Sequence, residues 1–259
     1  MRTCMFCRKK ASSTEDVWPL WLMRRFPSSD KARTYAEIGA RDLGNWRSAK
    51  PTLAVKRVCG ACNNGWMSRL EEQAKPVLES ILDDKLKAVD TLLQAVVARW
   101  AVKTVMVLEA VDSSRSCFYS EDERSLMRTT QSIPKRTSVW IAMCVDHRDI
   151  YSAAKDLRTS RGDDGIRAFA TTMAFGPLAV QVVSIKTPAE IASTVAVTYE
   201  VSDGPWDRTL VQVWPSSANP LVWPPEYGLA QELGLEALTE RLRPDKKYEE
   251  IISTAGKEG

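Results

Sequence analysis

Two Cys-x-x-Cys pairs in the first part of the chain place the strongest constraint on its fold. Cys4 and Cys7 form one pair, and Cys59 and Cys62 form the other. Each pair presents two sulfur atoms from one tight turn, so two pairs supply the four thiolates of a tetrahedral zinc site. A site with four sulfur ligands keeps no open position, which makes this zinc structural. Spacing alone leaves a mononuclear iron site with the same ligands open.

The chain has two further cysteines and a single histidine. Cys117 and Cys144 lie in apolar sequence, and we interpret them as core thiols rather than metal ligands. The one histidine, His147, excludes metal sites that need two or three imidazoles from one chain.

The most apolar stretch, residues 92–111, is interrupted by Arg99, Lys103 and Glu109. It therefore predicts a buried helix rather than a membrane span, and no apolar leader precedes it. We accordingly expect a cytoplasmic, reducing setting and no membrane partner.

Positive charge is concentrated toward the N-terminal end. The net charge of the chain is only +3, but residues 1–70 carry a clear excess of Lys and Arg, and the remainder is net acidic. A polyanionic partner such as DNA would therefore meet the N-terminal part. A solvated charged surface without a partner is the alternative.

Polar residues follow both cysteine pairs in an ordered pattern. Glu-Asp-Val-Trp-Pro (15–19) lies after the first pair, and Asn-Asn-Gly-Trp (63–66) follows the second directly. Over residues 4–71 this pattern resembles the HNH (His-Me finger) endonucleases of the four-cysteine type. The resemblance implies a zinc-bound ββα, treble-clef-like module over residues 1–71 that cleaves DNA by metal-assisted phosphodiester hydrolysis, in a bacterium or phage.

The resemblance also assigns roles to individual residues. Glu15 corresponds to a ligand of a catalytic Mg²⁺ or Mn²⁺, and Asn63 to a second ligand or orienting amide. The general-base histidine of the family falls on Asp16, whose ordinary pKa is about 2.6 units lower than that of histidine. A positioned base contributes about 10²–10⁴-fold to rate, so this exchange bears directly on activity.

Asp16 leaves several interpretations open. It could ligate the metal while a metal-bound water or His147 supplies the base, which describes a slow or altered nuclease. It could instead mark a catalytically inactive adaptor that binds DNA or a protein partner. The natural protein could also carry histidine at this position. An exposed histidine at a strand end is the simpler interpretation of His147.

Basic side chains near the motif are candidates for phosphate contacts. The candidates are Lys9, Lys10, Arg24, Arg25 and Arg69. For Arg69, a surface salt bridge with Glu72 is an equal alternative. Trp18 and Trp21 are interpreted as core of the small module, with base stacking as the alternative.

Residues 72–259 predict an α+β domain whose role is unknown. Helices are expected at about 68–110, 120–132 and 229–242, the second opened by a capping box at 120–123. Strands are expected at 137–145, 167–175, 178–185, 195–201 and 209–215. The predicted fold class is therefore α+β, with helices packed on a mainly antiparallel sheet. This domain would support the module, form a homo-oligomer or bind a protein partner.

Overall fold

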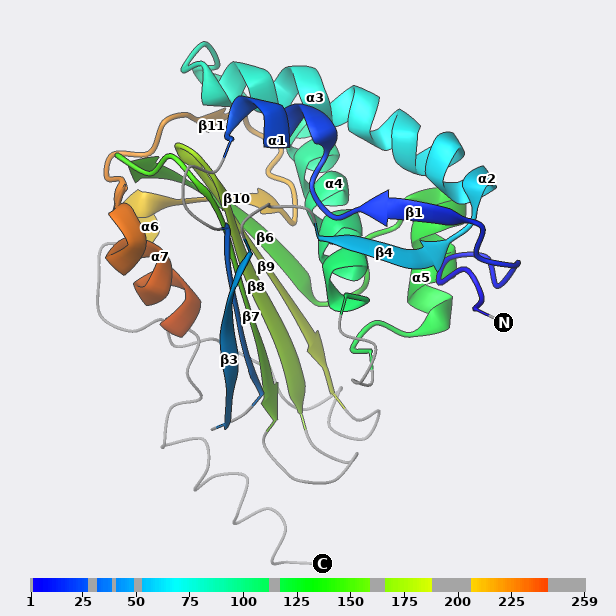
Figure 1. Cartoon of the computed structure of the whole chain (residues 1–259). Coiled ribbons are helices and arrows are strands. Elements are labelled where there is room, and N and C mark those ends of the chain that lie inside the picture. The colour runs from blue at the N-terminus through cyan, green and yellow to red at the C-terminus, as the bar shows by residue number, and fades with distance from the viewer. Residues whose placement is uncertain are drawn as a thin grey trace, which may run out of the picture.

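The computed structural model describes residues 2–27, 32–38, 41–48, 53–111, 117–158, 166–187 and 206–241. Within these ranges, helices pack on a curled, mainly antiparallel sheet (Figure 1). The predicted α+β class is confirmed at this level. The strand expected at 195–201 lies outside the described residues.

The large sheet has eight strands, arranged in the order β10-β6-β9-β8-β7-β2-β3 with β12 beside β6. Neighbours run antiparallel except β2 beside β7 and β12 beside β6. The strands are β2 (Ala32–Ile38), β3 (Arg41–Ser48), β6 (Thr137–Val145), β7 (Ile150–Arg158), β8 (Arg167–Phe175), β9 (Leu178–Lys186), β10 (Leu210–Trp214) and β12 (Leu229–Ala230).

The predicted strands agree closely with the observed ones. β6 and β8 have the predicted bounds, and β9 and β10 differ from theirs by a residue. β8 and β9 form a hairpin around Gly176, whose φ of +53° favours glycine. The ring of Phe26 also packs where a side chain at Gly176 would project. The strands β7, β2 and β3 were not predicted from the sequence.

The large sheet carries a hydrophobic cluster on each face, and successive side chains of a strand enter different clusters because they alternate in direction. On β6, Ile141 belongs to the main core, whereas its neighbour Ala142 belongs to a smaller cluster that includes Leu235 and Leu238. Helix α7 (Gln231–Glu240) supplies those two leucines and lies within the predicted 229–242 helix. The four-residue helix α6 (Trp206–Thr209) leads into β10.

The opposite face of the sheet packs against α4 (Thr91–Glu109), which is buried along most of its length. By length and composition alone this helix could cross a membrane, but 61% of its apolar window is buried inside the fold. The predicted 68–110 helix is in fact two helices, α3 (Ser68–Leu82) and α4. The Asp90 side chain caps α4 by accepting a hydrogen bond from the Leu93 N–H at 2.9 Å, so a new helix starts at this point.

Helix α5 (Glu121–Thr130) begins as predicted with the Ser120–Glu123 capping box. Its neighbour α4 is joined to it by a buried ion pair, in which Arg124 Nη2 lies 2.8 Å from Glu109 Oε2. Burial raises the pKa of Glu109, although Arg124 opposes that change.

The N-terminal part forms its own small sheet. β1 (Ser13–Asp16) pairs antiparallel with β4 (Ala54–Val58), and α1 (Leu20–Arg25) follows β1. After β4 the chain enters α2 (Gly60–Cys62), the π-helical turn η1 (Asn63–Met67) and α3, with a kink at Gly65, whose φ of −100° and ψ of −108° are non-helical. A second short sheet joins β5 (Ala88–Val89) and β11 (Leu221–Val222).

The hairpin β2–β3, which lies between β1 and β4 in sequence, extends the large sheet through β7. One hydrophobic core also runs from the N-terminal part, through α4, to the sheet. The N-terminal part and the remainder of the chain therefore share both a sheet and a core.

Candidate metal centre and its surroundings

The first cysteine pair lies on a tight turn. The Arg8 N–H donates to the Cys4 carbonyl at 2.9 Å, and the Cys4 N–H donates to the Lys9 carbonyl at 2.7 Å. Arg8 takes a positive φ of 62°, which closes the turn. The Met5 N–H donates to the Arg57 carbonyl at 2.8 Å, which ties this turn to the end of β4.

The second pair lies where a helix begins. The Cys59 carbonyl accepts hydrogen bonds from the Cys62 and Asn63 N–H groups, both at 3.0 Å. Because Cys59 precedes α2 and Cys62 ends it, one helical turn sets the separation of the two sulfur atoms. The small residues Gly60 and Ala61 occupy the positions between them.

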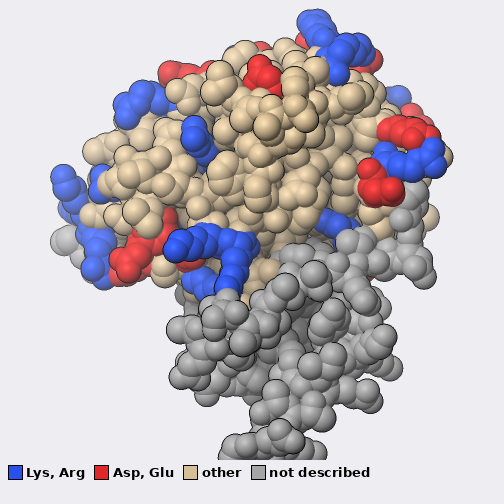
Figure 2. Space-filling view, turned by 180° about the vertical axis from the view of Figure 1, so that it is seen from behind, with Lys and Arg blue, Asp and Glu red and all other residues tan. Residues whose placement is uncertain are grey.

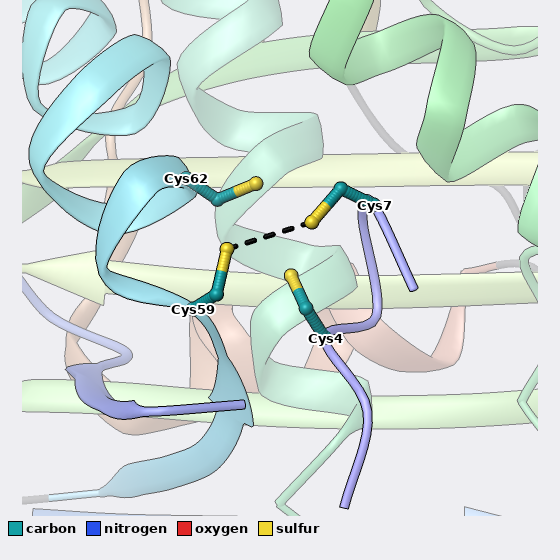
Figure 3. A group of neighbouring side chains, drawn as sticks. All are labelled: Cys4, Cys7, Cys59 and Cys62. Atoms are coloured by element: carbon teal, nitrogen blue, oxygen red, sulfur yellow. Dashed lines mark hydrogen bonds between the residues drawn. The ribbon is translucent and has the colours of Figure 1, made fainter. Parts of the chain in front are cut away.

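The four sulfur atoms converge. All lie within 4.8 Å of one another, and the Cys7 and Cys59 Sγ atoms are 3.5 Å apart (Figure 3). Three of these cysteines are buried and Cys7 is half-buried. Across the described ranges, they are the one group of three or more Cys, His, Asp or Glu side chains placed to hold a metal ion. The predicted convergence of these four cysteines is confirmed.

The donor set suits zinc, because four thiol groups at this separation can surround one soft cation. Thiols must lose protons to bind it. Burial opposes ionisation of Cys59, but the Cys62 N–H and the neighbouring thiols lower its pKa to about 7. Burial raises the pKa of Cys62 and Cys7. Phe6, which lies between Cys4 and Cys7, meets Trp66 edge to face with ring centroids 5.0 Å apart.

The cysteines outside the cluster behave as core residues where the structure describes their burial. Cys144 is buried in the smaller hydrophobic cluster that also contains Leu235 and Leu238 of α7, and burial raises its pKa to about 12. Cys117 is half-buried.

The candidate catalytic residues engage different partners. Glu15 and Asp16 are adjacent on β1 and point to opposite sides, so Glu15 is buried and Asp16 is exposed. Asn63 lies on η1, and its Nδ2 donates to Ser13 Oγ at 2.8 Å and to the Thr14 carbonyl at 3.1 Å. Asn63 thus fastens the helix to β1. Its amide N–H groups are directed at β1, whereas the Glu15 carboxylate faces a lysine.

That lysine is Lys103, in the middle of α4. Its Nζ atom lies 2.6 Å from Glu71 Oε1 and 3.7 Å from Glu15 Oε1, and its side chain is 0% exposed. Burial raises the pKa of Glu15 to about 7; Lys103 lowers it and Glu71 raises it further. Neither Lys103 nor Glu71 was predicted from the sequence to belong to a site. The one signal was a lysine in the middle of a mainly apolar helix.

Four of the five basic candidates are exposed without an ion pair to any described residue: Lys9, Lys10, Arg24 and Arg69. Arg25 instead pairs with Asp83, and hydrogen bonds from Lys85 and Arg25 lower the pKa of that carboxyl. On the face opposite to that of Figure 1, charged groups of both signs lie mainly toward the margins, and uncharged side chains cover most of the centre (Figure 2).

His147 lies half-buried in the turn between β6 and β7 of the large sheet. Glu15, by contrast, lies on β1 of the small sheet. The predicted position of His147 at a strand end agrees with the structure, but its side chain is half-buried rather than exposed.

The chain matches no protein-family model, and no curated protein or solved structure is detectably similar to it. The convergence of the four cysteines is therefore the part of the expected site that the structure supports directly.

Proposed function

We propose that this chain is a zinc-stabilised, non-catalytic DNA-binding protein, derived from a module that resembles the HNH endonucleases. One observation carries the proposal: the Glu15 carboxylate faces the buried Lys103 ammonium and is only 6% exposed. A carboxylate in that position is directed into the fold rather than toward a phosphate diester in solvent.

The other two candidate catalytic residues support the same conclusion. Mg²⁺ needs several oxygen ligands and keeps part of its water shell. Asp16 is exposed on the opposite side of β1 from Glu15, and the Asn63 amide nitrogen donates to Ser13 and Thr14. Glu15 and Asn63 thus have separate partners within the fold, and Asp16 is both directed away from Glu15 and a weaker base than histidine.

DNA is the proposed partner because exposed cations surround the zinc module. Lys9 and Lys10 follow the first cysteine pair, and Arg69 lies in the first turn of α3. Each is exposed and forms no ion pair with the described part of the chain. Such cations can neutralise phosphates and release counterions, which gives binding that weakens as salt rises.

Fluorescence anisotropy of a labelled DNA duplex with the zinc-loaded chain tests this proposal. We expect saturable binding whose log K decreases linearly with log[salt]. The steepness of that line should fall by about 0.9 for each phosphate-neutralising cation removed by Lys9→Ala, Lys10→Ala or Arg69→Ala. Arg8→Ala is the matched control, because Arg8 is exposed in the same turn but already pairs with Glu121. Binding that is absent, or equally affected by Arg8→Ala, contradicts the proposal.

A second candidate function is the HNH-like endonuclease, and the Glu15 environment is the observation that favours it. A carboxyl with a pKa raised to about 7, next to the exposed Asp16, is the kind of group that catalytic sites use. Plasmid nicking with Mg²⁺ or Mn²⁺ separates the two functions. Nicking by the natural chain that Glu15→Ala abolishes establishes the nuclease. Nicking that appears only in Asp16→His indicates an inactive derivative.

A further inference from the structure

Glu15, Glu71 and Lys103 form a cluster of charged side chains in which the lysine is fully buried. Its members come from three elements: Glu15 from β1, Glu71 from α3 and Lys103 from α4. The ammonium is fully buried, and one oxygen from each carboxylate is within 3.7 Å of it. Two anionic oxygen donors from separate elements thus converge on one buried cation.

We propose that the Lys103 ammonium occupies the place of a divalent cation between Glu15 and Glu71 and thereby keeps Mg²⁺ and Mn²⁺ out of the module. The inference rests on the proposed non-catalytic function and explains how that state is maintained. The lysine is the protein's own cation, so it competes from a fixed position and needs no ion from solution.

Charge and geometry both support this assignment. One ammonium facing two carboxylates leaves the cluster short of positive charge when both carboxylates are ionised, a balance that a divalent ion would satisfy. Carboxylate oxygens are also the donors that Mg²⁺ and Mn²⁺ prefer. The ammonium already holds the nearer oxygen, that of Glu71, at 2.6 Å, which is the distance of a charge-assisted hydrogen bond.

Shortening the lysine tests the proposal. Mn²⁺ is titrated into the zinc-loaded chain, and free Mn²⁺ is followed by electron paramagnetic resonance. We expect Lys103→Ala to bind Mn²⁺ at least about tenfold more tightly than the natural chain, a change of about 1.4 kcal/mol. The double variant Lys103→Ala with Glu71→Gln should lose this gain, because one oxygen donor has become a neutral amide.

Arg99→Ala is the matched control, since it removes another cation from the same helix without opening the Glu15–Glu71 pair. Lys103→Gln retains most of the side-chain length and removes the charge, so it carries the test if Lys103→Ala folds poorly. Mn²⁺ should raise the midpoint of thermal unfolding of Lys103→Ala and of Lys103→Gln. It should leave that of the double variant Lys103→Ala with Glu71→Gln unchanged.

Two results would overturn the inference. The first is a folded Lys103→Ala or Lys103→Gln chain with no gain in Mn²⁺ affinity, or variants that stay unfolded even with Mn²⁺ present. The second is saturable Mn²⁺ binding by the natural chain that Glu71→Gln removes. Nicking of DNA by the natural chain overturns the proposed function itself. If the natural chain does not nick DNA and the Lys103 variants gain no Mn²⁺ affinity, only the role of Lys103 is overturned.

Discussion

The indole ring of Trp18 meets the ring of Phe175 edge to face, with centroids 5.3 Å apart. Trp18 follows β1 of the small sheet, and Phe175 ends β8 of the large one. Phe175 also contacts Trp100 of α4 at 5.8 Å. These aromatic contacts therefore join the N-terminal part, the central helix and the sheet, and we expect the three to unfold together.

Trp18→Ala should consequently destabilise the whole chain rather than the N-terminal part alone. The side chain is 1% exposed, and removal of a large buried aromatic costs about 3–5 kcal/mol. Urea unfolding followed by circular dichroism and by zinc release should give coincident transitions at a lower midpoint. Trp21→Ala, at a half-buried position, is the matched control and should have a smaller effect. Separate transitions for the two probes would show that the module unfolds independently.

Zinc removal should unfold the N-terminal part, because an ion held by the four cysteines would join its two cysteine turns. We expect one zinc per chain by atomic emission, and loss of that zinc with reduced helical signal in Cys59→Ser. Cys144→Ser is the control, since Cys144 is a buried thiol outside the cluster. Retention of the full zinc content by Cys59→Ser would contradict the four-sulfur site.

Glu15 should make stability depend on pH near neutrality. Burial raises the pKa of Glu15 from 4.5 to about 7, so the folded chain holds the Glu15 proton more tightly than the unfolded chain does. The favourable contribution of this proton to the free energy of unfolding is fully present below pH 4.5. That contribution then disappears as the pH rises toward 7, because the unfolded chain ionises first. The change is on the order of 3 kcal/mol. The stability difference between the zinc-saturated natural chain and Glu15→Gln should therefore shift in favour of Glu15→Gln over this window and stay constant above it. A difference that does not vary with pH would contradict the assignment.

Gly176→Ala should destabilise the β8–β9 hairpin. The positive φ of this residue costs a β-carbon about 1–2 kcal/mol, and the ring of Phe26 already fills the space beside it. Chemical denaturation should show a lower midpoint with an unchanged slope. In the Phe26→Ala background, Gly176→Ala should cost less stability than it does in the natural chain, because the clash with the Phe26 ring is gone. The two single effects should therefore not add. Purely additive effects would mean that the backbone conformation alone accounts for the destabilisation.

Local patterns predicted much of the secondary structure. The β-branched and aromatic runs predicted the bounds of β6 and β8, and the capping box predicted the start of α5. β7 has the sequence Ile-Tyr-Ser-Ala-Ala-Lys-Asp-Leu-Arg, whose alanine and charged residues carry little strand preference. Its pairing with β8 and with the sequence-distant β2 makes it a strand.

The amino-acid sequence by itself determined two pairs of sulfur atoms, because the short-range geometry of each Cys-x-x-Cys turn sets the spacing within a pair. The meeting of the two pairs depended on the fold. The sequence also determined which residues near those pairs carry oxygen and which carry positive charge. Only the tertiary structure decided that Glu15 faces inward and that Lys103, from a helix far along the chain, meets it there. The physical reason is that ligand spacing within a turn is set by a few backbone angles, whereas the partner of a buried charge depends on how separate elements pack.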